Sequence, residues 1–450
     1  MNWNIFKKKK VVTRFAPSPT GLFHVGSARV ALFNYLFTKQ NKGEFLLRIE
    51  DTDEARSKPE WTEMIYESLK WLGIDYTKSF IQSERTEVYK KYLEKLISED
   101  KAYVSKEEVK EEGQRAEVIR FRNPNKKVKF TDLIRGEIEF DTTELGDFVI
   151  AKSLSEPIFH LTNVIDDFES GITHAIRGED HISNTPRHIL IFEALGGQAP
   201  VYAHLPLILS ESREKLSKRK HGEIVSIAYY QKLGFLPQAF INFIALLGWN
   251  PGTDQEIMSM DELIKKFDIM KVQKSGAIFN QEKLLWFNKE YIKRLPVERL
   301  RKEIKEKLDK KYTYSEELLK RIVPIISDRI NTFGELEKYV IEGEFDYFFL
   351  KPEIKKEMLI WKKDTDFQIP KNNLKKVLEM IEKLYDVDFT DEILKKKLMP
   401  LAEELGKGSV LWPLRVALSG QEKSPDPFTL LVILSKNESM ERVKSAISLL

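Results

Sequence analysis

The sequence contains no cysteine. The protein can therefore form no disulfide bond and no thiolate metal site, an absence that fits a reducing compartment. The sequence also lacks any run of 18 consecutive apolar residues, and the lysines at Lys7–Lys10 are not followed by an apolar signal core. We therefore expect no membrane span, no secretory peptide and a cytoplasmic location.

A strong excess of charge of one sign is missing as well. The 450 residues include 73 Lys and Arg against 70 Asp and Glu, which leaves a formal net charge of +3. Overall charge therefore does not indicate a nucleic-acid partner, which would need basic residues gathered on one face. What the chain does have is apolar material, 42% of its residues with 27 Phe and 7 Trp, enough to bury several interiors. Its length suggests about three domains.

The segment Val11–Tyr35 predicts a strand, a turn and a helix. Val11–Phe15 is rich in β-branched and aromatic residues, which suit a buried strand. Two prolines and a glycine follow, and neither a strand nor a helix continues easily through them. From Ser27 onward, apolar residues recur at helical spacing.

His24 and Gly26 lie where this turn meets the helix. A glycine lets a phosphate approach the backbone, and the free N–H groups and the dipole at a helix start attract anions. An imidazole can also donate a hydrogen bond to a phosphate oxygen. The segment therefore predicts a nucleotide-binding site.

Motifs in four parts of the chain carry a resemblance to a known family. Phe23–Gly26 reads Phe-His-Val-Gly and follows Arg14–Gly21, which reads Arg-Phe-Ala-Pro-Ser-Pro-Thr-Gly. Leu47–Asp53 contains Arg-Ile-Glu-Asp-Thr-Asp, Ile176–Pro186 contains Arg-Gly-Glu-Asp-His, and Lys215–Arg219 reads Lys-Leu-Ser-Lys-Arg. In this order they resemble the HIGH, RIEDTD and KMSKS segments of class I aminoacyl-tRNA synthetases, in the bacterial glutamyl-tRNA synthetase form.

The resemblance implies an α/β fold: a doubly wound, Rossmann-like catalytic domain with a parallel sheet, split by a connective-peptide insertion and followed by an all-α C-terminal half. Strand and helix patterns alternate in the first half of the chain, and only helices are indicated beyond residue 300, which agrees with this fold. The implied domains are residues 1–103 and 163–230 (catalytic), 104–162 (insertion, acceptor-binding), 231–300 (helical, stem contact) and 301–450 (all-helical, anticodon-binding). The main predicted strands are 11–15, 44–49, 172–177 and 202–209, and the main predicted helices are 59–73, 84–100, 185–195, 374–384, 391–405 and 440–449.

The activity that the resemblance implies is ATP-dependent ligation of L-glutamate to the 3′ end of tRNA(Glu) through a glutamyl-adenylate. Mg²⁺ is expected to arrive with ATP. The insertion lacks the cysteines that some members of the family use for zinc, so no protein-bound zinc is expected. Charging of tRNA(Gln) as a second acceptor stays open, and a monomer is expected.

The resemblance also implies the site residues. A lysine-rich loop at Glu214–Lys220 would supply mobile ammonium groups that follow the phosphates, although such a loop standing alone could be merely exposed and basic. The implied catalytic residues are His24, Lys215 and Lys218. The implied ATP-binding residues are Ser18, Thr20, His24, Gly26, Ser217 and Lys218. The implied glutamate-binding residues are Arg14, Ala16, Ser18, Glu50, Phe159, Asn163 and Arg177.

A pocket for glutamate needs two guanidinium groups for the two carboxylates and one acid for the ammonium. By resemblance, Arg14 takes the side-chain carboxylate, Arg177 the α-carboxylate and Glu50 the α-amino group. Two positions depart from the family pattern. Phe159 stands where the family usually has a tyrosine, and Ser27 stands where the HIGH signature has its second histidine.

Three alternatives share parts of this pattern. A glutamyl-queuosine tRNA synthetase would lack the helical residues 301–450. A glutaminyl enzyme would differ at Ala16–Thr20, which follows the glutamyl pattern. A non-catalytic tRNA-binding paralogue is not favoured, because the motif residues of the catalytic machinery are all present.

Overall fold

The structure, a computed structural model, describes residues 10–53, 55–108 and 115–450, except for the side chain of Lys218. The chain forms two compact units, one extending to Tyr291 and one from Ile292 to Leu450.

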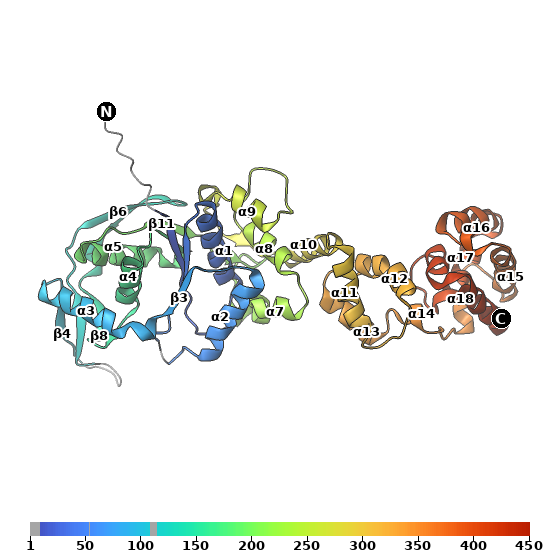
Figure 1. Ribbon diagram of the computed structural model, residues 1–450, viewed down its shortest axis with the longest axis horizontal. Helices are drawn as coiled ribbons and strands as arrows, with labels where there is room; N and C mark the ends of the chain where they lie inside the picture. Colours follow the sequence, from blue (N-terminus) through green and yellow to red (C-terminus); the bar gives the residue numbers. More distant parts are fainter. Residues whose placement is uncertain (1–9, 54, 109–114) are drawn as a thin grey trace, which may run out of the picture. The chain divides into compact units, whose positions relative to one another are not determined.

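Figure 1 shows the elements of both units. The strands are β1 (Val12–Phe15), β2 (Glu44–Ile49), β3 (Lys78–Ile81), β4 (Ala102–Lys106), β5 (Glu117–Phe121), β6 (Lys127–Asp132), β7 (Gly136–Asp141), β8 (Phe148–Ser153), β9 (Glu156–Pro157), β10 (His174–Gly178), β11 (Val201–Leu205), β12 (Ile208–Leu209) and β13 (Ala277–Ile278). The helices of the first unit are α1 (Val25–Gln40), α2 (Pro59–Leu72), α3 (Thr86–Ser98), α4 (Phe159–Glu169), α5 (Thr185–Ala194), α6 (Lys218–His221), α7 (Ile227–Lys232), α8 (Pro237–Ala245), α9 (Met260–Lys266) and α10 (Gln281–Lys293).

Two groups of parallel strands lie side by side in the catalytic sheet. β1 pairs with β2 and β2 with β3, and β10 pairs with β11. β10 adjoins β1, because Thr173 N, just before β10, donates to Val12 O at 2.9 Å. The spatial order is therefore β3-β2-β1-β10-β11, and the winding direction changes between β1 and β10. Ligands of open α/β sheets bind at such a switch point.

Helices cover both faces of this sheet (Figure 1). Successive strand residues point to opposite faces, as the period of two requires. Ile176 and Ala203 pack in the core with α1, α2 and α8, whereas their neighbours Ala175 and Tyr202 pack in the core with α3, α4 and α5. The predicted doubly wound α/β class is confirmed.

The predicted insertion at 104–162 contains two different structures. β4, β5, β8 and β9 form an antiparallel sheet of their own. β6 and β7 form a hairpin, and Asp132 of β6 pairs with Tyr202 of β11, so the hairpin extends the catalytic sheet. The predicted boundary between residues 162 and 163 falls inside α4.

Two local predictions for the first unit are wrong in part. The predicted strand at 202–209 is two strands, because Pro206 lacks the N–H needed to continue the ladder, and β12 pairs with β13 instead. The predicted loop Glu214–Lys220 contains the start of a one-turn helix, α6, which begins at Lys218.

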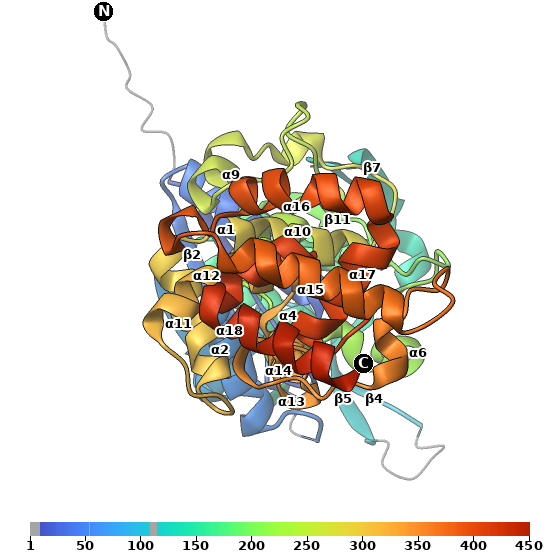
Figure 2. The ribbon, with the colours of Figure 1, turned by 90° about the vertical axis from the view of Figure 1, so that its right-hand side faces the viewer.

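The second unit is described at every residue and contains helices but no strand, as the sequence predicts. α17 packs against α15, α16 and α18 in this unit (Figure 2). Gly406, with φ of 98°, ends α16, and Pro427 begins α18. Its helices are α11 (Val297–Leu308), α12 (Glu316–Arg329), α13 (Phe333–Glu342), α14 (Asp346–Phe349), α15 (Gln368–Glu382), α16 (Asp391–Leu405), α17 (Lys407–Ser419) and α18 (Pro427–Leu449).

None of the helices in the described ranges combines the length and the apolar character that crossing a membrane would require. Helix α18 is the longest, and it is interrupted at Ser435, whose φ of 69° is not helical.

Candidate active site

One cavity of about 1350 Å³ lies at the end of the catalytic sheet where β1, β2, β10 and β11 terminate. Every predicted site residue whose side chain the structure describes lines this cavity. The side chain of Lys218 lies outside the described part of the structure, and its backbone follows Ser217 at the start of α6. The predicted residues that line the cavity are Arg14, Ala16, Ser18, Thr20, His24, Gly26, Glu50, Phe159, Asn163, Arg177, Lys215 and Ser217.

His24 caps the N-terminus of α1. Its Nδ1 accepts a hydrogen bond from the backbone N–H of Gly26 at 2.9 Å. Because that N–H can only donate, Nδ1 carries no proton, and the neutral imidazole holds its proton on Nε2. Burial and the nearby charge of Lys215 lower the pKa of His24, which favours this neutral form. His24 therefore lines the cavity as a neutral imidazole with its proton on Nε2, and the same ring makes a hydrogen bond with the backbone of Leu216.

Gly26 lines the cavity next to His24. Its N–H is not free for a phosphate, because His24 Nδ1 already accepts it. A Cβ at this position would lie 3.2 Å from His24 Nδ1, closer than most side chains tolerate. The absence of a side chain at Gly26 therefore lets the imidazole fold over the helix start, and a role of Gly26 in ATP binding stays a prediction.

The lysine-rich loop is attached to this helix start on both sides. After the loop, Ser226 forms a β-bridge with His24, and Ile227 N donates to Phe23 O at 3.0 Å. Before the loop, the buried guanidinium of Arg29 on α1 donates to the carbonyl of Pro206. These links bring Lys215 and Ser217 to the cavity wall that His24 lines.

Glu50 follows β2 and presents one carboxylate oxygen to the protein and one to the cavity. Its Oε1 accepts from Arg48 Nη2 and from Asn163 Nδ2, each at 2.9 Å. No described residue donates to Oε2. Since Glu50 lines the cavity, this second oxygen is available to an ammonium group.

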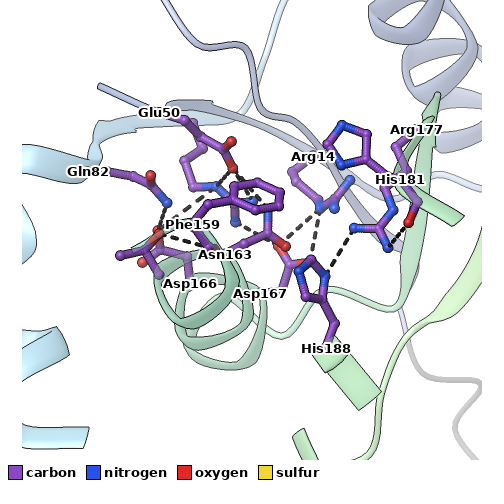
Figure 3. A network of polar contacts seen from close by, with 12 residues as sticks. Arg14, Glu50, Gln82, Phe159, Asn163, Asp166, Asp167, Arg177, His181 and His188 are labelled. Carbon is purple, nitrogen blue, oxygen red and sulfur yellow. Dashed lines mark hydrogen bonds and ion pairs between the residues drawn. The ribbon is translucent and has the colours of Figure 1, made fainter. Parts of the chain in front are cut away.

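Asp167 on α4 binds two arginines that come from different strands. It accepts from Arg14 Nε at 3.0 Å (Figure 3). It also accepts from Arg48 Nη1 at 2.6 Å. Burial raises the pKa of Asp167, but the charges of Arg14 and Arg48 outweigh burial and hold that pKa below its ordinary value. Asp167 therefore stays anionic. Among the described residues no group accepts a hydrogen bond from the terminal nitrogens of Arg14, which remain available to a ligand.

Arg177 at the end of β10 is a buried cation that pairs with no carboxylate of the described residues. Its Nε donates to His204 Nε2 at 3.2 Å, its Nη1 lies 3.1 Å from His188 Nδ1, and its Nη2 donates to Thr185 Oγ1 at 2.8 Å. Burial lowers the pKa of both histidines, so these partners are uncharged. Burial also lowers the pKa of Arg177 to about 10, which leaves it charged at neutral pH. The site therefore contains an uncompensated positive charge suited to an anion.

Phe159 begins α4 and forms an apolar part of the cavity wall. Its ring centroid lies 5.5, 5.6 and 5.5 Å from those of His160, His181 and His188. Burial lowers the pKa of His160 and of His181 to about 4, so these rings are neutral at physiological pH. The wall therefore adds neither a charge nor, at Phe159, a hydroxyl donor.

Sequence reasoning missed the residues that support the site. Asp166, next to Asp167, accepts from Gln82 Nε2 at 2.7 Å and from Arg85 Nε at 2.8 Å, which joins α4 to the 3-10 turn Gln82–Arg85 just before α3. A signal was present: two consecutive acids stand in the otherwise apolar helical run 164–168, and Arg48 stands in a buried strand. Buried charges need partners, so these residues could have been predicted to pair.

Family models match both units. A model described as tRNA synthetases class I (E and Q), catalytic domain, matches residues 10–117 and 105–286. A model described as an anticodon binding domain matches residues 296–447.

Similar proteins extend the match over nearly the whole chain. A protein named glutamate–tRNA ligase 1 from Petrotoga mobilis is 38% identical, with 96% of this chain and 97% of the relative covered. One named glutamate–tRNA ligase from Aquifex aeolicus is 40% identical, with 96% and 98% covered. A crystal structure of a glutamate tRNA ligase from Elizabethkingia meningosepticum in complex with its amino acid has a TM-score of 0.87 at 35% identity, with 98% of this chain and 99% of that chain covered. The present chain therefore belongs to the glutamate–tRNA ligases, within the class I aminoacyl-tRNA synthetases.

Proposed function

We propose that this protein ligates L-glutamate to the 3′ end of tRNA(Glu), using ATP and passing through glutamyl-adenylate. The observation that carries the proposal is that one cavity brings the predicted site residues together. His24 and Lys215 line it on the side of the helix start and the lysine-rich loop. Arg14, Arg177 and Glu50 line the same cavity. A triphosphate and a small diacid can therefore be held against each other, and holding them so is the main catalytic requirement of this reaction.

The unused hydrogen-bonding groups of the cavity residues match the charged groups of glutamate. Glutamate carries two carboxylates and one ammonium. Arg14 donates to Asp167 through Nε alone, which leaves its two terminal nitrogens for one carboxylate. Nη1 of Arg177 contacts His188, and Nη2 donates to Thr185 and, at 3.5 Å, to the His181 carbonyl, which leaves the second hydrogen of Nη1 for the second carboxylate. Oε2 of Glu50 receives the ammonium.

The ATP side of the cavity supplies donors and positive charge. His24 donates through Nε2, and Ser18 and Thr20 add hydroxyl groups at the loop that precedes α1. Lys215 and Lys218 neutralise the charge that develops on the phosphates. Mg²⁺ accompanies ATP as part of that substrate. Within the described ranges, no group of three or more acidic or histidine side chains is arranged to hold a metal ion.

The reaction proceeds in two balanced steps. A carboxylate oxygen of glutamate attacks the α-phosphorus of ATP, the bond to the β-phosphate oxygen breaks, and pyrophosphate leaves. A ribose hydroxyl at the tRNA 3′ end then attacks the acyl carbon, loses its proton and displaces AMP. Neither step needs a protein nucleophile, so the protein acts through positioning and charge.

The remaining regions serve the tRNA in this proposal. The insertion at 104–162 holds the acceptor end, 231–300 contacts the stem, and the helical region 301–450 reads the anticodon. The enzyme works as a monomer in the cytoplasm.

The test is exchange of labelled pyrophosphate into ATP by the purified chain, with tRNA(Glu) present throughout so that a requirement for tRNA is met. We expect exchange with glutamate and none with glutamine or aspartate. Absence of exchange with glutamate, or equal exchange with another amino acid, would contradict the proposal.

A further inference from the structure

The orientation of Arg177 is set by uncharged partners rather than by an acid. Its Nε donates to Nε2 of His204 at 3.2 Å, and its guanidinium is buried. An arginine held by neutral acceptors keeps its full charge for a ligand, but its position depends on those acceptors presenting a lone pair. The protonation state of His204 therefore matters to the geometry of Arg177.

Asp132 fixes that protonation state. Its Oδ2 lies 2.6 Å from Nδ1 of His204 and also accepts from the backbone N of His204 at 3.0 Å. Neither side chain is exposed to solvent. The His204 interaction and backbone donors outweigh burial and hold the pKa of Asp132 below its ordinary value, so Asp132 is an anion. An anion beside Nδ1 places the imidazole proton there and leaves Nε2 as the acceptor that Arg177 requires.

Asp132 belongs to the β6–β7 hairpin, which lies within the predicted insertion. Its Oδ1 accepts from the backbone N–H groups of Ile134 and Arg135 at 2.9 and 2.8 Å, which ties the carboxylate to the hairpin turn. Arg135 in this turn also forms an ion pair with Glu179, the residue after β10. The turn is therefore attached to the segment of the chain that carries Arg177.

We propose that Asp132 and His204 are positioning residues for the amino acid: through the chain Asp132–His204–Arg177, the β6–β7 hairpin holds the arginine in the orientation that receives a substrate carboxylate. This inference rests on the proposed function, in which Arg177 binds glutamate. It gives the hairpin a task in the amino-acid pocket in addition to the contact with tRNA proposed for the insertion.

Two substitutions of His204 separate positioning from general support of the fold. Asn reaches the position of Nδ1 and can still donate to Asp132, but it is too short to contact Arg177. Gln reaches the position of Nε2 and can still accept from Arg177, but it loses the contact with Asp132. If the chain of contacts positions Arg177, His204→Asn should impair glutamate binding more than His204→Gln.

The measurement is glutamate-dependent pyrophosphate exchange, with tRNA(Glu) present, over a range of glutamate and ATP concentrations. Loss of a hydrogen bond to a buried charged group predicts a rise in the KM for glutamate of at least about tenfold for His204→Asn. For His204→Gln the expected rise is under about threefold, because the acceptor is retained. The KM for ATP should change little in both variants, since Arg177 is assigned to the amino acid.

Asp132→Asn is a second test, which also serves if His204→Asn does not fold. An amide at this position can still accept from the turn through its oxygen, but its NH₂ group opposes the proton on Nδ1 of His204. We expect a rise in the KM for glutamate without a matching rise in that for ATP. Asp147→Asn is the matched control, because this carboxylate of the same insertion contacts Asn123 and Tyr103, not Arg177.

The outcomes distinguish a failure of the proposed function from a failure of the positioning role. A wild-type chain without glutamate-dependent exchange would overturn the proposed function itself. An active wild type whose His204→Asn and His204→Gln variants have equal KM values for glutamate would overturn the positioning role alone. An effect of Asp147→Asn as large as that of Asp132→Asn would overturn it as well.

Discussion

Arg14 and Asp167 form a buried ion pair across 153 positions of the sequence, with 3.0 Å between Nε and Oδ1. The pair joins β1 to α4, and Arg48 of β2 shares the same carboxylate. Because Arg14 uses only its Nε for this contact, the pair orients the guanidinium while its terminal nitrogens stay available. The Arg14–Asp167 ion pair therefore orients the guanidinium group that we expect to bind the ligand.

Replacement of Asp167 by Asn should destabilise the protein. The change leaves Arg14 and Arg48 buried without their shared anion, for which we expect a loss of about 3 to 5 kcal/mol in the free energy of unfolding. Asp75→Asn is the control, because Asp75 pairs with Lys39 at the surface and its loss should cost under about 1 kcal/mol. Chemical denaturation at pH 7 measures both, and equal effects would contradict the account.

The contribution of Asp167 to the free energy of unfolding should also depend on pH and should be lost in acid. The pKa of Asp167 is lowered in the folded protein, so its stabilisation is complete above the unfolded pKa of about 3.9 and is lost as the pH falls through the folded value. The difference in stability between wild type and Asp167→Asn should therefore be constant from pH 8 to about 5 and shrink only in stronger acid. Denaturation curves across this range would contradict the account if the difference vanished near pH 6.

Gly26→Ala should reduce activity without unfolding the protein. The added Cβ would lie 3.2 Å from His24 Nδ1 and displace the imidazole, for which we expect at least about a tenfold fall in the rate of pyrophosphate exchange. The free energy of unfolding of this variant should be unchanged or slightly higher, since alanine is favoured over glycine in a helix by about 1 kcal/mol. Gly21→Ala is the matched control in the same segment, because a Cβ there has no atom within 4 Å. Equal rates in the two variants would count against the positioning of His24.

Phe159→Tyr should lower the KM for glutamate or leave it unchanged. The new hydroxyl adds a donor to a wall that has none at this position, with an effect of about 0.5–1.5 kcal/mol if it bonds the substrate. The KM for ATP, measured in the same exchange assay, is the internal control and should not move. A marked rise in the KM for glutamate would mean that this pocket binds its ligand in another way.

Lys218→Ala should slow adenylate formation at least about a hundredfold, because an ammonium that neutralises the phosphates in the transition state is lost. The fold should remain intact, as judged by circular dichroism and thermal unfolding. Lys220→Ala is the control from the same loop, since the ammonium of Lys220 is already paired with Glu214 at 2.9 Å and lies at the surface. Normal exchange in Lys218→Ala would refute its assignment.

The sequence was sufficient for the elements whose pattern is local. β2 and α16 have the predicted bounds, because β2 is a short apolar run and the apolar residues of α16 recur at helical spacing. β3 was not indicated, since Lys78–Ile81 is short and only partly buried and therefore has no clear pattern. The join of the β6–β7 hairpin to β11 was also not indicated, because pairing between distant strands leaves no mark in either segment alone.

For the site, the motifs identified the residues that line the cavity but not the contacts that hold them. Arg48 and Asp167 are 119 positions apart, and nothing local to either residue specifies the other. The same holds for the chain from Asp132 through His204 to Arg177. Gly26 lines the cavity as predicted, but the hydrogen bond from its N–H to His24 forms only once the helix start is folded, so the sequence does not indicate it.

The most direct test of the central claim is a charging assay with the purified chain, ATP, labelled glutamate and purified tRNA(Glu), run beside tRNA(Gln) and beside the Lys218→Ala variant. We expect wild type to attach glutamate to tRNA(Glu) and the variant to do so at least about a hundredfold more slowly. Failure of the wild type to acylate tRNA(Glu) with glutamate, or charging by the variant at the wild-type rate, would contradict the central claim.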